Sequence, residues 1–237
     1  STPTGSNNNA PEGVSFGTTS PTTFTSMTPR YAVMATAEGE QTTIEGAVDI
    51  DASGTMTITI DNIEYTVTNR KTETAQTLSY IKDLTTGQIT FRGSYFTIRG
   101  QADKQHNIVV EGSYTYIYGG NLDDTLQEIS TLGAANRLYG GNGNDTIVIR
   151  SASGKAYGQG GNDNISVYSS TADSDGGAGD DIINIHASSG DHIGGTGNDT
   201  FNINANSNTI NAGAGNDTFN ISSNSNKLNG EADVRIY

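Results

Sequence analysis

The ten residues GGNGNDTIVI at positions 140–149 decide the fold of this chain, because the same pattern recurs at a fixed period. Four further segments align with it without gaps: GQGGNDNISV at 158–167, GGAGDDIINI at 176–185, GGTGNDTFNI at 194–203 and AGAGNDTFNI at 212–221. Each segment starts 18 residues after the one before it. A fixed period of this kind predicts a solenoid, in which each unit buries its apolar edge on the next.

A finer period of nine residues lies inside the first. Candidate inward-facing side chains recur every nine residues from Ile147 to Leu228, and the rhythm extends backward across a three-residue insertion to Ile108. Each coil is therefore expected to contain two short strands, joined by turns in which glycine permits positive φ angles. The pattern predicts an all-β fold, a right-handed parallel β-roll or β-helix solenoid over residues 99–237, preceded by a β-rich unit.

The residues before the repeat divide into two regions. Residues 1–30 contain all four prolines and many Ser, Thr and Asn residues, which indicates a linker or arm. Residues 31–98 alternate with period two and are expected to form a small β-rich domain or an N-terminal cap. Ser1 stands where an initiator methionine would, which suggests a fragment of a longer protein or a processed N-terminus. The expected elements are a hairpin of Thr55–Ile60 and Ile63–Val67, strands at Gln88–Phe91 and Ser94–Ile98, and a helix over Thr72–Asp83.

The composition favours cations as partners. The chain has 12 Lys and Arg residues against 26 Asp and Glu, a net charge of −14. Such a surface repels nucleic acids and anionic membranes, since both carry phosphates. Cysteine is absent, which excludes thiolate metal sites, and no apolar run is long enough for a transmembrane helix. We therefore expect neither nucleic acid binding nor membrane insertion.

The glycine-aspartate turns are the candidate metal site. Ca²⁺ prefers oxygen ligands and takes six to eight of them at about 2.3–2.6 Å. An ion between two successive turns, stacked about 4.8 Å apart, could take oxygens from both. The alternative is that these aspartates only form hydrogen-bonded Asx turns. The aspartates share the sixth position of the pattern: Asp145, Asp163, Asp181, Asp199 and Asp217.

The pattern GGxGxDxUx, where U is a large apolar residue, resembles the nonapeptide of the RTX (repeats-in-toxin) family of calcium-binding β-rolls. The resemblance covers roughly residues 119–221 and implies about four or five Ca²⁺ ions along the roll. It also implies that each aspartate bridges two ions and that carbonyls of the first four positions complete the shells. A less regular copy at 119–126 adds Asp124 at the end of the row. The other implied ligands are the five aspartates above with Gly140, Gly141, Asn142, Gly143, Gly158, Gly160, Gly161, Gly176, Gly177, Gly179, Gly194, Gly195, Gly197, Gly213 and Gly215.

The sequence departs from the RTX pattern in the second turn of every coil. A full RTX roll carries the motif in both turns, but the equivalent aspartate positions here hold no carboxylate: Gly154, Ala172, Gly190, Asn208 and Asn226. Calcium is therefore expected on one edge of the roll only. Within the motif turns, Gln159 replaces a second-position glycine and Ala212 a first-position glycine.

No catalytic constellation is found, so we expect a protein that is not an enzyme. RTX proteins are typically bacterial, leave the cell unfolded by type I secretion and fold in external calcium. The resemblance thus implies a calcium-binding structural module of a secreted or cell-surface protein, such as an adhesin, surface layer or appendage. Its partners would be calcium and possible extracellular polysaccharide or other subunits of a surface assembly. The alternative is a carbohydrate- or polymer-binding module, or an accessory module of a secreted protease, lipase or epimerase. Ice binding is disfavoured, because only Thr196 provides a threonine at the third motif position.

Overall fold

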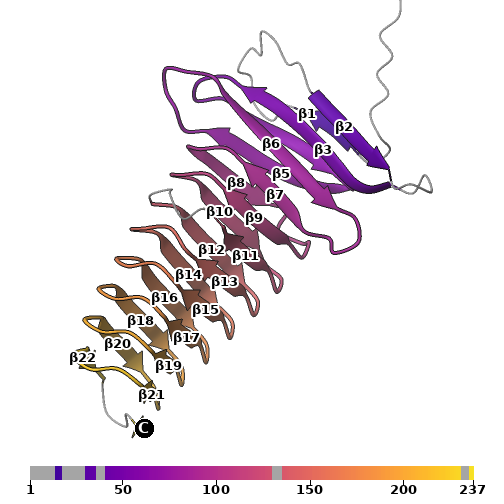
Figure 1. Ribbon diagram of the computed structural model, residues 1–237. Helices are drawn as coiled ribbons and strands as arrows, with labels where there is room; N and C mark the ends of the chain where they lie inside the picture. Colours follow the sequence, from indigo (N-terminus) through magenta and orange to yellow (C-terminus); the bar gives the residue numbers. More distant parts are fainter. Residues whose placement is uncertain (1–13, 18–29, 36–40, 130–134, 231–234) are drawn as a thin grey trace, which may run out of the picture.

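The computed structural model describes residues 14–17, 30–35, 41–129, 135–230 and 235–237. All of the helix or strand structure in these ranges is β-strand, arranged as a parallel solenoid with an antiparallel region at its N-terminal end (Figure 1). The predicted all-β solenoid is therefore confirmed. The described residues contain no helix able to span a membrane.

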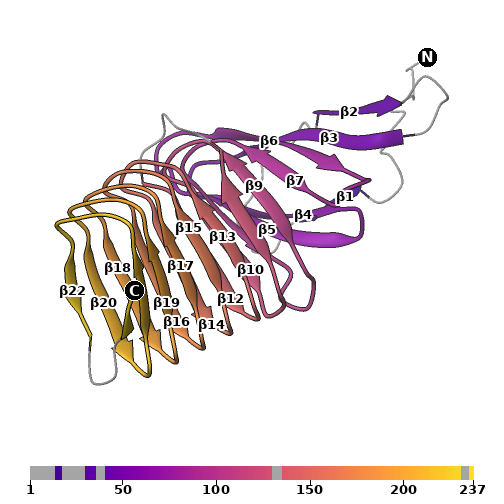
Figure 2. The same ribbon diagram turned by 60° about the horizontal axis from the view of Figure 1, so that its bottom comes forward.

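Two long sheets form the solenoid, and each coil contributes one strand to each sheet (Figure 2). In sheet order, the first consists of β1 (Val14–Gly17), β4 (Thr55–Ile60), β5 (Ile63–Asn69), β8 (Phe96–Gly100), β10 (Tyr116–Gly120), β12 (Arg137–Asn142), β14 (Lys155–Gly160), β16 (Asp173–Ala178), β18 (Asp191–Thr196), β20 (Thr209–Ala214) and β22 (Lys227–Asn229). The second consists of β2 (Arg30–Ala35), β3 (Gln41–Ile50), β6 (Gln76–Asp83), β7 (Ile89–Arg92), β9 (Asn107–Glu111), β11 (Thr125–Glu128), β13 (Thr146–Ile149), β15 (Asn164–Val167), β17 (Ile182–Ile185), β19 (Thr200–Ile203), β21 (Thr218–Ile221) and β23 (Arg235–Ile236).

The nine-residue rhythm sets the register of the coils. Ile147 pairs with Ile165 of the next coil and Ile165 with Ile183, so side chains 18 residues apart stack on each other. All three are fully buried. The insertion shifts the pairing to 21 residues in both sheets, where Ile117 lies opposite Leu138 and Leu126 opposite Ile147, and the inward register is kept. The predicted inward positions are thus confirmed back to Ile108.

The N-terminal strands belong to the same two sheets as the coils. β3 to β8 pair in antiparallel fashion, but β7 also pairs in parallel with β9, and β8 with β10. Parallel stacking thus begins before residue 99, and one continuous core of buried side chains runs through both regions. The strand β1, which lies inside the predicted linker of residues 1–30, pairs with β4.

The predicted hairpin is confirmed, and the predicted helix is wrong. Asp61 and Asn62 have φ angles of 52° and 58°, as a type I′ turn between β4 and β5 requires. Residues Thr72–Asp83 form no helix, and Gln76–Asp83 is strand β6 between β3 and β7. Its alternate residues Leu78 and Tyr80 are buried, and this period of two decides the structure over local helix propensity.

Candidate metal centre

The motif turns form one edge of the solenoid, where each first-sheet strand leads into a second-sheet strand. We call this the motif edge, and the opposite set of turns, at 151–154 and its equivalents, the second edge. Gly141 and Gly143 have φ angles of +121° and +105°. A methyl group on Gly141 would lie 2.0 Å from the carbonyl oxygen of Gly120 in the preceding coil. Close stacking alone therefore requires these glycines, so they are no evidence for a metal.

Some non-glycine residues are accommodated at the motif edge. Gln159 holds a second position with a φ of +81°, a conformation that costs energy for a residue with a Cβ atom. The fifth position carries a ladder in which each backbone N–H donates to the side-chain oxygen one coil earlier, such as Asn162 to Asn144 at 2.7 Å. Asp180 and Asn198 continue this ladder. These fifth-position side chains therefore stack along the motif edge.

The motif aspartates form a second, buried ladder. Six side chains lie in one row and are at most 2 % exposed: Asp124, Asp145, Asp163, Asp181, Asp199 and Asp217. The Oδ1 atom of each accepts the backbone N–H of the residue one coil earlier, at 2.7 to 2.9 Å. These hydrogen bonds tie successive coils together and use one oxygen of every carboxylate.

The second oxygen of each aspartate, Oδ2, is buried and has no hydrogen-bond partner within the described part of the chain. It faces the first glycine of its own turn and a carbonyl of the next coil. A methyl group on Gly158 would lie 2.1 Å from Oδ2 of Asp163 and 2.4 Å from the carbonyl oxygen of Gly176. The same pairing of carboxylate and carbonyl occurs at Gly119, Gly176 and Gly194. A buried carboxylate oxygen that has no donor and lies near a carbonyl oxygen favours a proton or a cation as its partner.

Burial changes the acidity of this row. Desolvation raises the pKa of Asp145 and Asp181 to about 7, and neighbouring aspartates add to the effect. It raises the pKa of Asp124, Asp163 and Asp199 to about 6. These values hold for the protein without metal, so a bound cation would take the place of protons that the row otherwise holds near neutral pH.

The second edge carries the same ladder with asparagine. Gly190 N–H donates to Oδ1 of Asn208 at 2.9 Å, and Asn208 N–H donates to Oδ1 of Asn226 at 2.9 Å. Here the other side-chain atom is a donor, and the Nδ2 group of Asn208 donates to the carbonyl of Ala205 at 3.3 Å. Asn136 is arranged in the same way, with its Nδ2 group on the carbonyl of Gly112. The asparagines of this ladder, Asn136 and Asn208, therefore need no cation to satisfy their side chains.

Several predicted carbonyl ligands are already engaged. Third-position carbonyls of Ala178 and Thr196 accept backbone N–H groups of Gly161 and Gly179 at 2.8 Å. Second- and fourth-position carbonyls point at α-carbons of the next coil, such as the Gly143 carbonyl at Gly161. The described residues hold no group of three or more His, Cys, Asp or Glu side chains able to surround one metal. An ion at the motif edge would thus rest on aspartate Oδ2 atoms and first-position carbonyls, with carbonyls or water completing its shell.

One buried acid was overlooked in the sequence. Glu128 is fully buried beside the insertion, and its carboxylate accepts the Nδ2 group of Asn136 at 2.7 Å and the backbone N–H groups of Arg150 and Ser151. Hydrogen bonds therefore satisfy both carboxylate oxygens of Glu128, which lies at the start of the second edge. His192 holds one of the inward positions of the nine-residue rhythm; it is 1 % exposed and its Nδ1 atom lies 2.9 Å from Oγ of Ser174.

Fold and site together define a parallel β-solenoid with a row of half-satisfied buried aspartates on one edge. In comparisons with protein-family models, curated proteins and solved structures, none matched this chain. The resemblance to RTX proteins therefore remains one of motif and spacing.

Proposed function

We propose that this chain is a calcium-binding structural module whose solenoid folds and becomes rigid when Ca²⁺ occupies the motif edge. About four or five ions would lie between successive motif turns. The Oδ2 atoms of the six aspartates and the first-position carbonyls would hold them, and each ion would supply the positive charge that these acceptors lack.

The unpartnered Oδ2 atoms are the observation that carries this proposal. The ladder itself needs only one oxygen per residue, and Asn208 shows that an amide forms it with both side-chain atoms satisfied. Compared with asparagine, aspartate leaves the ladder unchanged and adds a buried acceptor, Oδ2, near a carbonyl oxygen. A buried charge without a partner destabilises a fold, so six in one row favour a cation as ligand.

The setting in which such a module would act follows from its chemistry. Without calcium, the buried carboxylates that lack partners would destabilise the fold. Binding of Ca²⁺ would then make folding depend on a medium rich in calcium. We extend the proposal to a secreted or cell-surface bacterial protein, exported by type I secretion. There the module would serve as a rigid part of an adhesin, surface layer or appendage, alongside extracellular polysaccharide or other subunits.

Calcium titration of the chelator-treated chain tests the proposal. Far-UV circular dichroism should show a gain of β structure on adding Ca²⁺, and calorimetry should count about four or five ions. At a thousandfold excess over Kd, each ion would stabilise the fold by about 4 kcal/mol. Mg²⁺ is the control, since it dehydrates reluctantly and should bind far more weakly. Identical spectra and melting temperatures in chelator and in excess calcium would refute the proposal.

A further inference from the structure

A row of stacked rings crosses the outer face of the first sheet and stops partway. Tyr118 stacks on Tyr139 with ring centroids 4.4 Å apart, and Tyr139 on Tyr157 at 4.7 Å, with nearly parallel planes. The guanidinium group of Arg99 covers the outer face of Tyr118 at 3.7 Å. The next two residues of the row are Asp175 and Ile193. The row thus ends in a cation at one end and in the free face of Tyr157 at the other.

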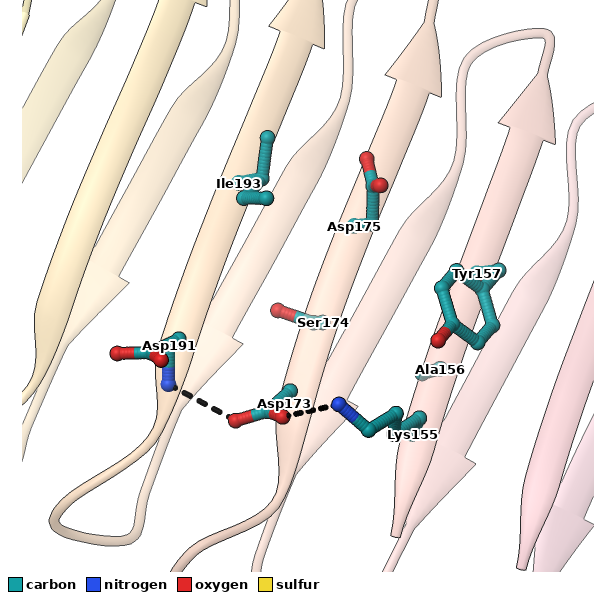
Figure 3. Close-up of a pocket in the computed structure, with 8 residues that line it drawn as sticks. All are labelled: Lys155, Ala156, Tyr157, Asp173, Ser174, Asp175, Asp191 and Ile193. Carbon is teal, nitrogen blue, oxygen red and sulfur yellow. Dashed lines mark hydrogen bonds and ion pairs between the residues drawn. The ribbon is translucent and has the colours of Figure 1, made fainter.

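The end of the row at Tyr157 borders a cavity of about 230 Å³ (Figure 3). Asp175 lies on β16, between Tyr157 on β14 and Ile193 on β18, and all three face outward. Strands two apart are separated by roughly 9.6 Å, and a planar group in van der Waals contact on both faces occupies about 7–8 Å. The shorter aspartate side chain therefore leaves room for one planar group above it. The volume is below the ~300–1,000 Å³ typical of drug-sized ligands, so it suits a single side-chain group.

The charges around this slot favour a cation. Lys155 is paired with Asp173 at 2.7 Å, and Asp173 also accepts the backbone N–H of Asp191. The side-chain carboxylate of Asp175 has no hydrogen-bond partner among the described residues. One lysine and three aspartates therefore line the slot, and the carboxylate of Asp175, at its base, accepts no hydrogen bond from the described residues.

We propose that this slot binds a guanidinium group, as presented by an arginine side chain of a partner peptide. The group would stack on Tyr157 and donate hydrogen bonds to Asp175, completing the row as Arg99 completes its other end. The chain uses this contact elsewhere, with Arg70 over Tyr116 at 3.5 Å and Arg150 over Tyr168 at 4.3 Å. Guanidinium is planar, weakly hydrated and suited to both ring faces and carboxylates.

Nuclear magnetic resonance titration of the full chain in excess calcium tests the slot with three probes of similar size. These are Nα-acetyl-arginine amide, its neutral citrulline counterpart and Nα-acetyl-lysine amide. We expect saturable shifts of the Tyr157 ring and Ile193 methyl signals, with arginine binding at least about tenfold more tightly than citrulline. Weaker binding of lysine than of arginine would support a planar cation over a point charge.

Two variants complete the test. Asp175→Asn should weaken arginine binding about tenfold, whereas Glu64→Gln, an exposed carboxylate outside the slot, should leave it unchanged. Circular dichroism would show that both variants keep the fold. Equal binding of citrulline and arginine, or binding that survives Asp175→Asn, would overturn the assignment. The assignment would also be overturned if methyl glucoside, and not the arginine probe, shifted the signals of Tyr157 and Ile193, since the slot would then bind a sugar. The slot opens on the outer face of the first sheet, but Asp175 directly precedes Gly176 of a motif turn, and its charge acts on Asp181. Calorimetric titration of Asp175→Asn with Ca²⁺ should match that of the unaltered chain, which separates a loss of arginine binding from a loss of calcium binding.

Discussion

The motif edge and the second edge carry the same hydrogen-bonded ladder, but one is built with aspartate and the other largely without carboxylates. At both edges a side-chain Oδ1 atom accepts a backbone N–H from the preceding coil. The difference lies in the second atom, which is an unpartnered acceptor in Asp181 and a satisfied donor in Asn208. Stacking of the coils therefore requires only the Oδ1 atom, which both edges share. The Oδ2 atom of each motif aspartate is not needed for stacking, and its lack of a partner indicates a ligand.

The edges also differ in how the backbone turns. The second edge places Ser153, Thr171 and Ser189 in left-handed conformations, with φ angles of 56–69°, and their side chains fit there. The motif edge uses glycine at positions where the carbonyl of the preceding coil leaves no room for a side chain. At four motif turns a carbonyl oxygen of the neighbouring coil lies close to the buried carboxylate, which is the environment that a hard cation prefers.

Among single substitutions, placing a carboxylate on the second edge should have the largest effect. Asn208→Asp keeps the ladder oxygen but replaces the Nδ2 donor, which now faces the Ala205 carbonyl, with an acceptor. We expect a loss of about 3 kcal/mol, because a buried charge is left unpaired. Chemical denaturation at neutral pH measures this loss. Calcium should not restore it, and full recovery in calcium would contradict the difference drawn between the edges.

Changing the pH acts on the whole row of aspartates at once and should distinguish bound protons from bound calcium. Burial raises the pKa of Asp145 and Asp181 to about 7, whereas an unfolded aspartate titrates near 3.9. The calcium-free fold therefore retains protons that the unfolded chain releases, so its stability should fall as the pH rises from about 4 to about 7.

In excess calcium the trend should reverse, since protons compete with the ion for the same oxygens and binding weakens below about pH 7. Melting temperatures across this range, with chelator and with calcium, measure both trends. Parallel curves in the two media would show that the aspartates do not bind the ion.

Removing one carboxylate from the motif edge should have the smallest effect without metal. Asp181→Asn copies the second edge, since its Nδ2 group would face the carbonyl of Gly194. We expect the calcium-free chain to gain about 1–2 kcal/mol, because an unpaired buried acceptor becomes a satisfied donor. The same variant should lose part of its calcium-induced rise in melting temperature. A destabilised calcium-free variant with an unchanged calcium response would show that the carboxylate serves the ladder alone.

Much of the fold was predictable because the repeat makes one local rule apply many times. The inward positions from Ile108 onward and the I′ turn at Asp61 and Asn62 both follow from spacing and residue type. The strand Gln76–Asp83 was not predictable in this way, since its turn-rich start and polar residues fit a short helix equally well. Its pairing with β3 and β7, which are distant in the sequence, decides its structure.

The sequence by itself determined the period of the coils, the inward side chains and the confinement of the motif aspartates to one edge, because these depend on spacing and residue identity alone. The tertiary structure decided which oxygen of each aspartate is used by the ladder and which is left without a partner. It also decided where the tyrosine row ends, beside Asp175. Both depend on contacts between residues one coil apart, since stacking brings together atoms that lie 18 or more residues apart along the chain.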